Sequence, residues 1–230
     1  MSTALITGAS SGLGRALALR LARDGFTIVG VARHPEPLRE VVGEIVASGG
    51  KAHAIPADVG DRASATRIAG EAHALVGHVD VLVHCASTLG ETPLRLVADT
   101  EPDVFDEVLQ VNLAGPFRLT KALLGPMVLR GRGAVVFVSS DAAVEGYPTW
   151  GAYGASKAGL DQLARVWAAE LAGTGVRVVS LDPGDMDTPM HAAAIPDADP
   201  ATLARPDDVA ARVADLLREL PPTVRMKVSS

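Results

Sequence analysis

The chain has 230 residues, enough for one sizeable α/β domain but too few for two comfortable ones, so residues 1–230 are expected to form a single domain. Hydrophobic residues make up 48% of the chain and aromatic residues only 3%, which favours a core of Ala, Val, Leu and Ile over a β-sandwich. The net charge is −6 and Lys and Arg are scattered, so we expect no nucleic-acid partner. The sequence shows no leader and no long apolar run, which predicts a cytoplasmic protein with no membrane partner.

Short runs rich in Val, Ile and Leu alternate with longer helical patterns along the chain. Because strands that alternate with helices indicate βαβ units, we predict a Rossmann-like, doubly wound parallel sheet of six to seven strands with helices on both faces. The expected strands are residues 4–7, 27–32, 52–59, 79–86, 134–140 and 176–182, with 224–228 as a short edge strand. The Pro- and Asp-rich stretch 189–208 is expected to be a mobile loop that contains a short helix.

The first expected strand runs into TGASSGLG, residues 7–14, and then into a helix with Leu13, Leu17 and Leu21 at helical spacing. Gly8 permits a tight turn, Gly12 lets the backbone approach a pyrophosphate, and Gly14 lets helix and strand pack closely. Ser10 and Ser11 add hydroxyls where the helix presents free N–H groups. The alternative is a glycine-rich turn with serine caps and no ligand, which the flanking strand and helix disfavour.

The end of the second strand indicates which nicotinamide cofactor is bound. A carboxylate there would hydrogen-bond a ribose 2′-hydroxyl, whereas a basic group would pair with a 2′-phosphate. The chain has Ala32, Arg33 and His34, so NADP(H) is favoured over NAD(H). The alternative for Arg33 is an ordinary solvated loop arginine, and Ser11, in the glycine turn, adds no basic group that would support this preference.

Tyr153 and Lys157 are four residues apart on a predicted helix, so their side chains share one face. A nearby ammonium and the positive nicotinamide ring would lower the pKa of the phenol and make it a proton donor to a carbonyl oxygen. Lys157 would also hydrogen-bond the nicotinamide ribose. Ser140 ends the fifth strand at the sheet edge where ligands bind, and would hydrogen-bond the same substrate oxygen.

Several motifs in register resemble the short-chain dehydrogenase/reductase family, single-domain type, over nearly the whole chain: TGASSGLG, DV at 58–59, VN at 111–112, YGASK at 153–157 and DPGDMDT at 182–188. The resemblance implies that Ser140, thirteen positions before the tyrosine, is the catalytic serine, and that the Asn112 side chain supports a water that connects Lys157 to solvent. It also implies that Asp58 and Val59 contact adenine, that Met186 meets the carboxamide, and that Thr188 caps that contact. The expected cofactor-binding set is Gly8, Ser10, Ser11, Gly12, Leu13, Gly14, Arg33, Asp58, Val59, Ala86, Tyr153, Lys157, Pro183, Gly184, Met186 and Thr188.

One family motif is altered, because HCAS at 84–87 replaces Asn-Asn-Ala-Gly and keeps only Ala86. His84 and Cys85 point to opposite faces of a strand, so no metal site is expected, and the lone thiol serves as a small buried apolar group.

On the substrate side, the loop at about 185–205 is short, which suggests an open site. Tyr147, Trp150 and Met190 are candidates for an apolar wall, Trp150 equally for core packing. The carboxylates that would surround the pocket mouth are those of Asp141, Glu145, Asp185 and Asp187, and Asp141 is also a candidate substrate contact.

The sequence therefore predicts an NADPH-dependent oxidoreductase that reduces a ketone or aldehyde reversibly, with Tyr153 as general acid/base and a small carbonyl or alcohol as its substrate. A non-catalytic NADP-binding sensor or scaffold is the alternative. A sugar-nucleotide epimerase would need a further substrate domain of ~100 residues. A homodimer or homotetramer is expected, in which the helix at 153–172 pairs two subunits through exposed Leu and Trp side chains.

Overall fold

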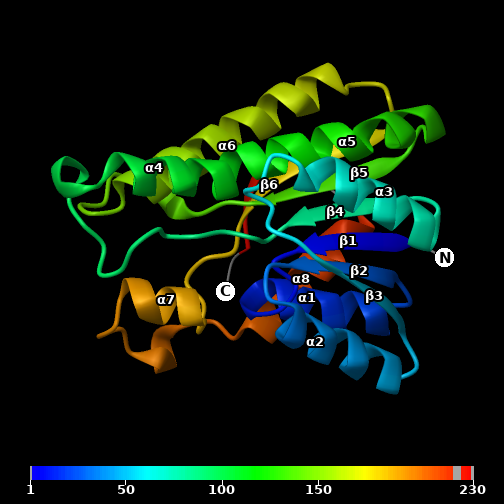
Figure 1. Cartoon of the computed structure of the whole chain (residues 1–230), viewed down its shortest axis with the longest axis horizontal. Helices are drawn as coiled ribbons and strands as arrows, with labels where there is room; N and C mark the ends of the chain where they lie inside the picture. The colour runs from blue at the N-terminus through cyan, green and yellow to red at the C-terminus, as the bar shows by residue number, and fades with distance from the viewer. Residues whose placement is uncertain (1, 220–223, 229–230) are drawn as a thin grey trace.

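The computed structural model describes residues 2–219 and 224–228, which build a seven-stranded, wholly parallel sheet in the order β3-β2-β1-β4-β5-β6-β7 (Figure 1). This confirms the doubly wound α/β prediction. The strands are β1 (Thr3–Thr7), β2 (Thr27–Ala32), β3 (Lys51–Pro56), β4 (Val81–His84), β5 (Gly133–Val138), β6 (Val176–Asp182) and β7 (Arg225–Lys227).

Three predicted strands continue too far at their carboxyl ends. β3 ends at Pro56, β4 at His84 and β5 at Val138, because the ladder of hydrogen bonds to the neighbouring strand ends there. The residues that follow, including Asp58, Cys85 and Ser140, lie in loops. The corrected boundaries place these side chains at the carboxyl edge of the sheet, where they are free of the alternation of a strand.

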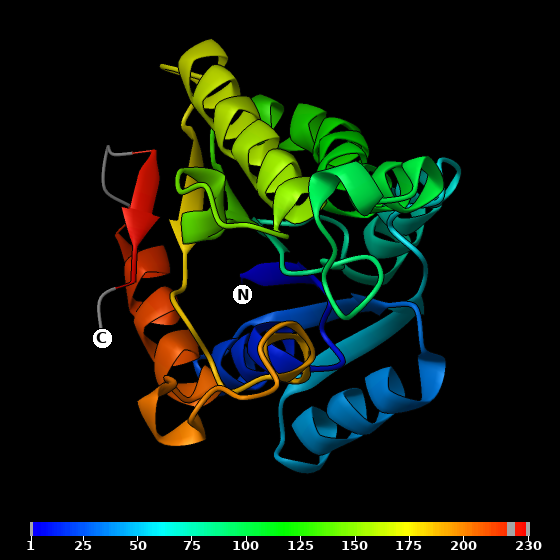
Figure 2. The same cartoon turned by 90° about the vertical axis from the view of Figure 1, so that its left-hand side faces the viewer.

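Helices cover both faces of the sheet. The α1, α2 and α8 helices lie on one face, and α3, α4, α5 and α6 lie on the other (Figures 1 and 2). The helices are α1 (Gly12–Arg23), α2 (Pro35–Ala47), α3 (Ser64–Val76), α4 (Pro102–Leu109), α5 (Gly115–Arg130), α6 (Gly151–Glu170), α7 (Pro189–Ala194) and α8 (Pro206–Arg218). Short 3₁₀ helices form at η1 (Val97–Asp99), η3 (Asp141–Ala143) and η4 (Pro200–Thr202), and a π-helix, η2 (Gln110–Ala114), joins α4 to α5.

The two faces of the sheet have separate cores. Leu17 of α1 and Val213 of α8 belong to one core, while Leu119 of α5 and Leu160 of α6 belong to the other. Trp167 is only 8% exposed and packs beside Phe137 and Phe117 in the second core, so the prediction of an exposed Trp on this helix is wrong.

The strand order indicates which edge of the sheet would bind a ligand. After β1 the chain crosses toward β2, and after β4 it crosses in the opposite direction toward β5, so the loops diverge between β1 and β4. Ligands bind at such switch points, outside the carboxyl ends of the strands. Figure 2 looks onto this edge, where α7 lies in front of the sheet. Among the described residues, none of the helices is long and apolar enough to cross a membrane.

Candidate active site

A cavity of about 720 Å³ runs along the carboxyl edge of the sheet. Loops that follow β1 to β6 all contribute to it, and α7 closes one side. Every residue predicted to bind cofactor or substrate lines this cavity, and so do Ser140, Tyr153 and Lys157, whereas Asn112 does not.

Two glycines of the turn between β1 and α1 stand where a side chain would clash. A Cβ on Gly14 would lie 2.2 Å from the Gly8 carbonyl oxygen, and one on Gly8, whose φ is +68°, would lie 2.8 Å from the Ala86 nitrogen. At Gly12 a Cβ would meet only the Thr188 side chain, at 3.4 Å. Gly14 therefore lets strand and helix pack closely, Gly8 lets the turn approach the loop after β4, and Gly12 exposes its backbone to the cavity.

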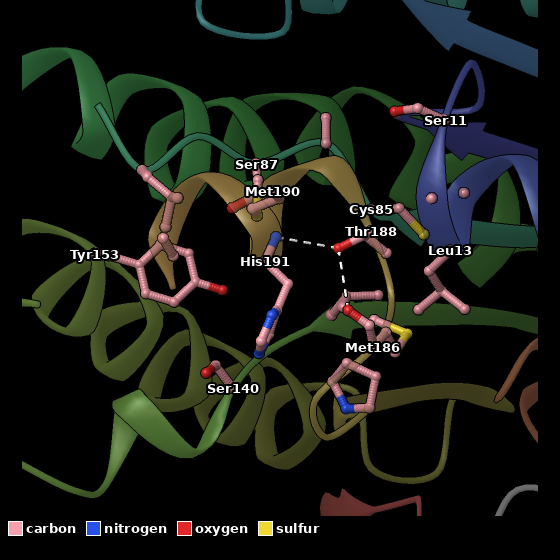
Figure 3. A pocket seen from close by; sticks show the side chains of 18 of the residues that line it. Ser11, Leu13, Cys85, Ser87, Ser140, Tyr153, Met186, Thr188, Met190 and His191 are labelled. Carbon is pink, nitrogen blue, oxygen red and sulfur yellow. Dashed lines mark hydrogen bonds between the residues drawn. The ribbon is translucent and has the colours of Figure 1, made fainter. Parts of the chain in front are cut away.

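The amino end of α1 suits an anion. Its first turn has no acidic residue, and the N-cap residue Ser11 makes no side-chain cap hydrogen bond, so the free N–H groups face the cavity with the helix dipole behind them. In Figure 3, Ser11 and Leu13 lie at one end of the pocket, and Tyr153 and Ser140 lie at the other. The amino end of α1, with Ser11 and the glycine turn, could therefore hold the phosphate groups of a dinucleotide.

The residues after β2 carry positive charge and no carboxylate. Arg33 is exposed and lines the cavity with His34, and no ion-pair partner of Arg33 is found in the described part of the chain. Glu36 is the nearest acid in the sequence, and it pairs with Arg39 on α2 at 3.3 Å. Asp58 also lines the cavity, where one carboxylate oxygen accepts a hydrogen bond from the Gly60 N–H at 2.8 Å.

Tyr153 and Lys157 lie in the first half of α6 and are both buried, 9% and 3% exposed. The Lys157 ammonium lies 5.4 Å from the centre of the Tyr153 ring and donates a hydrogen bond to the Val138 carbonyl oxygen at 2.8 Å. That carbonyl ends β5, two residues before Ser140, so one hydrogen bond links the helix to the strand that carries the serine.

The Tyr153 phenol is a weaker acid than predicted. Burial raises its pKa to about 12, and the charges of Asp141 and Asp182 act in the same direction, while the polar side chains of Ser140 and Ser87 oppose them. Burial also lowers the pKa of Lys157 to about 8. For the protein's own groups, the expected fall in the Tyr153 pKa is therefore wrong, because burial has the larger effect.

Ser140 is held by a carboxylate beside it. Its hydroxyl donates to Asp141 Oδ1 at 3.0 Å and accepts a hydrogen bond from the Ala142 N–H at 3.2 Å. Asp141 also accepts hydrogen bonds from the Ala142 N–H and the Tyr147 hydroxyl. The neighbouring Ser139 is 2% exposed, and its hydroxyl has no hydrogen-bond partner among the residues that the structure describes. Of the serine pair, it is Ser140 whose side chain acts on the pKa of the Tyr153 phenol.

Asn112 does not have the free side chain that the prediction requires. Its amide nitrogen donates to the Thr88 carbonyl oxygen at 2.8 Å and to Ser156 Oγ at 3.0 Å. Its amide oxygen accepts from the Ser87 hydroxyl at 3.1 Å and from the Thr88 N–H at 2.8 Å. Because these contacts use all its donors and lone pairs, the side chain braces the loop after β4 and cannot also hold a water.

Residues of the altered motif HCAS lie in two different environments, the core and the cavity. His84 is 3% exposed, stacks on Phe137 and shares a hydrogen bond with Thr120, and burial lowers its pKa to about 3. Cys85 and Ser87 instead line the cavity. Burial raises the pKa of the Cys85 thiol to about 12, so it stays a neutral thiol. In residues 2–219 and 224–228, no group of three potential metal ligands converges.

The predicted substrate residues form one wall of the cavity. Trp150 lies edge-on to Tyr153 with ring centres 5.5 Å apart, and Met190 packs against the same small cluster. Of the four carboxylates predicted at the mouth, only Asp141 and Asp185 line the cavity, so the predictions for Glu145 and Asp187 are wrong.

Several residues that were not predicted from the sequence line the same region, above all Ser87 and His191. His191 lies in the first turn of α7, where its backbone N–H donates to the Thr188 hydroxyl at 3.2 Å (Figure 3). A signal was present for Ser87, which is a polar residue where the family has glycine.

Comparison with known proteins shows which family has a similar sequence and fold. The family model described as short chain dehydrogenase matches residues 2–199. A short chain dehydrogenase of Pseudocercospora fijiensis is 38% identical over 191 residues, 83% of this chain. The 3-oxoacyl-(acyl-carrier-protein) reductase FabG of Thermotoga maritima is 36% identical over 186 residues, which are 81% of this chain and 74% of that protein.

Among solved structures, a variant of the actinorhodin polyketide ketoreductase with NADPH superposes with a TM-score of 0.91 at 29% identity. The match covers 99% of this chain and 95% of that one. The chain matches only 61% of the length of the Pseudocercospora fijiensis relative.

Proposed function

This chain belongs to the short-chain dehydrogenase/reductase family, and from that premise we propose that it reduces a ketone or aldehyde carbonyl with NADPH, with Tyr153 as the general acid. The observation that carries the proposal is the continuity of the cavity. A single space joins the glycine turn to Ser140, Tyr153 and Lys157, so a dinucleotide held at one end would extend to the other.

The residues present fit such a cofactor. The glycine turn and the amino end of α1 would hold the phosphates, Asp58 and Val59 would lie against the adenine, and Lys157 would hydrogen-bond the nicotinamide ribose. The bound cofactor would supply the hydride. The remaining functions in the reaction fall to the protein's own side chains.

Tyr153 would donate a proton to the carbonyl oxygen as hydride reaches the carbon. A pKa of about 12 keeps the phenol protonated at neutral pH, which suits a proton donor. Ser140 would donate a hydrogen bond to the same oxygen after its hydroxyl turns away from Asp141. That rotation leaves Asp141 with its hydrogen bonds from the Ala142 N–H and the Tyr147 hydroxyl. The Lys157 ammonium, held by Val138, would stabilise the phenolate that forms.

We propose NADPH over NADH because of the charge at the end of β2. Arg33 is free to pair with a 2′-phosphate, and no carboxylate lines the cavity at that point to accept a hydrogen bond from a 2′-hydroxyl. The NADPH complex of the similar ketoreductase supports the same choice.

The wall next to Tyr153 favours a small substrate with an apolar group beside its carbonyl. Leu89, Trp150 and Met190 supply apolar surface there, and Asp141 and Asp185 disfavour polyanions through like-charge repulsion.

The test is consumption of NADPH and, separately, of NADH by the purified protein with small and bulky ketones, aldehydes and diketones. Turnover with NADPH is expected, and the Tyr153→Phe variant should lose it by about 10³-fold while it still binds NADPH, because only the proton donor is removed. Tight NADPH binding without turnover on any carbonyl would instead support the sensor or scaffold alternative.

A further inference from the structure

Arg225 lies on β7, far along the chain from the residues discussed above, yet its guanidinium contacts Ser140 and Asp182, which line the cavity. Nε donates a hydrogen bond to Asp161 Oδ2 at 2.8 Å, and one terminal nitrogen donates to the Ser140 carbonyl oxygen at 3.1 Å. The same nitrogen lies 3.5 Å from Asp182 Oδ2. The side chain is 24% exposed, so most of this contact is shielded from water.

Both carboxylates that Arg225 meets are almost fully buried, each 2% exposed. Asp161 accepts a second hydrogen bond from the Ser180 hydroxyl, and Asp182 accepts one from the Gly184 N–H at 3.0 Å. A buried carboxylate is costly unless it is paired, so the one guanidinium compensates two charges that would otherwise repel each other.

The three partners of Arg225 belong to three different parts of the proposed machinery. Ser140 is the proposed catalytic serine, and Asp161 lies one turn after Lys157 on the helix that also carries Tyr153. Asp182 ends β6 and begins the turn at Pro183 and Gly184 that lines the cofactor cavity. A planar guanidinium fork fixes direction as well as distance, which a single charge on a flexible stem does not.

We infer that Arg225 is a positioning residue for hydride transfer: it fixes the backbone of Ser140 against the catalytic helix and offsets the charge of Asp182. The inference rests on the proposed function, since it assigns Arg225 a part in the geometry of Ser140 and Tyr153. A misplacement of about 1 Å in such a geometry can cost about 100-fold in rate.

Arg225 also acts on the proton donor through Asp182. The charged groups near the Tyr153 phenol are Asp141, Asp182 and Lys157, and Tyr147 and His191 line the same cavity. The negative charge of Asp182 raises the pKa of Tyr153. Without the adjacent guanidinium this charge would act at full strength, so the phenol would lose its proton at a higher pH.

The test compares Arg225→Met with Arg130→Met. Arg130 is a matched control, because its side chain is also 24% exposed, donates to a backbone carbonyl (Val79, 2.8 Å) and lies 3.8 Å from a carboxylate (Asp80), but at the amino edge of the sheet. The measurements are kcat, the KM for NADPH, and kcat against pH in the direction of alcohol oxidation, which requires the phenolate.

We expect Arg225→Met to lower kcat by about 10- to 100-fold with a KM for NADPH within about threefold of wild type. The rise of the oxidation rate with pH should move upward by about 0.5 to 1 pH unit. Arg225→Lys keeps the charge but not the fork, so it should restore the pH profile and leave kcat low. Arg130→Met should leave both kcat and the pH profile unchanged.

Wild-type kcat in Arg225→Lys would overturn the positioning role, and so would an Arg225→Met variant that matches Arg130→Met in kcat and pH profile. If Arg225→Met fails to fold, the Arg225→Lys result decides alone. An inactive wild-type protein would overturn the proposed function itself, a separate outcome.

Discussion

The two ends of the cavity are built by opposite means. At the glycine turn, the cavity is lined largely by backbone from a short stretch between β1 and α1. Around Tyr153, the cavity is lined by side chains from the loops after β4, β5 and β6 and from α6. The glycine turn is formed by neighbouring residues in the sequence and does not tolerate added atoms. The region around Tyr153 depends on tertiary structure and is sensitive to charge and to the pKa of each group.

Lys157→Met should show the largest effect, because it tests the chemical end directly. We expect kcat/KM to fall by about 10³-fold, since the variant loses the ammonium that would stabilise the Tyr153 phenolate and hold the ribose. Steady-state kinetics with NADPH and a reactive ketone would measure it. Activity within tenfold of wild type would show that the tyrosine works without its neighbour.

The same variant should alter the pH dependence of stability. Burial lowers the pKa of Lys157 from 10.5 to about 8, so between these values the unfolded chain holds a proton that the folded chain has released. The free energy of unfolding of the wild type, relative to Lys157→Met, should therefore rise with pH, by about 3 kcal/mol over the full window. Denaturant titrations at pH 7.5, 8.5 and 9.5 would measure the difference, and a difference that is constant with pH would contradict it.

Gly14→Ala tests the intolerance of the other end to added atoms. The new Cβ would lie 2.2 Å from the Gly8 carbonyl oxygen, so strand and helix must move apart. We expect the free energy of unfolding to fall by about 1–3 kcal/mol and NADPH to bind more weakly. The control is Gly43→Ala in α2, where a Cβ meets nothing within 4 Å, and this variant should gain about 0.5–1 kcal/mol. Equal changes in the free energy of unfolding of the two variants would show that the glycine turn has room for a side chain at Gly14.

Arg33→Ala should have a smaller effect, because it removes one exposed charge-assisted contact at the cofactor end. We expect the KM for NADPH to rise about tenfold, which is ~1.4 kcal/mol, while the KM for NADH stays the same. Arg39→Ala is the matched control, since Arg39 is also an exposed arginine near the end of β2 but lies outside the cavity. A parallel loss with both cofactors would mean that Arg33 does not read the 2′-phosphate.

Asp141→Asn should have the smallest effect, a shift in the pH dependence of alcohol oxidation. It tests whether the Tyr153 end of the cavity is sensitive to charge. The Asp141 carboxylate raises the pKa of Tyr153, and the amide oxygen of Asn could still accept from Ser140 and Ala142. The oxidation rate should therefore reach half its maximum at a pH lower by less than about one unit. Asp187→Asn, an exposed carboxylate outside the cavity, should leave the profile in place.

This contrast also explains what sequence could predict. The strands, the glycine turn and the Tyr153–Lys157 pair follow from patterns a few residues long, and the structure has them in the expected places. The use of Asn112 for bracing the loop after β4 could not be foreseen, because its partners Thr88 and Ser156 come from separate segments.

The direction of the Tyr153 pKa shift was missed for a similar reason. Helical spacing places Lys157 beside the phenol, but the extent of burial, which dominates the shift, depends on the packing of Trp150 and the loops after β4 and β5. The α8 helix, which the sequence analysis did not assign, had a local signal: Pro206 at its first position, followed by Asp207 and Asp208.

The two edges of the sheet bear on how the protein behaves at high concentration. In the described part of the chain, β3 and β7 are the outermost strands, and an exposed edge offers unpaired backbone groups to any passing strand. β3 begins with Lys51 and ends with Pro56, while β7 is only three residues long and carries Arg225 and Lys227. Short length, basic side chains and proline all discourage edge-to-edge aggregation. The strand that carries Arg225 is thus too short to offer a neighbouring molecule a long backbone edge, so pairing through this edge of the sheet is disfavoured.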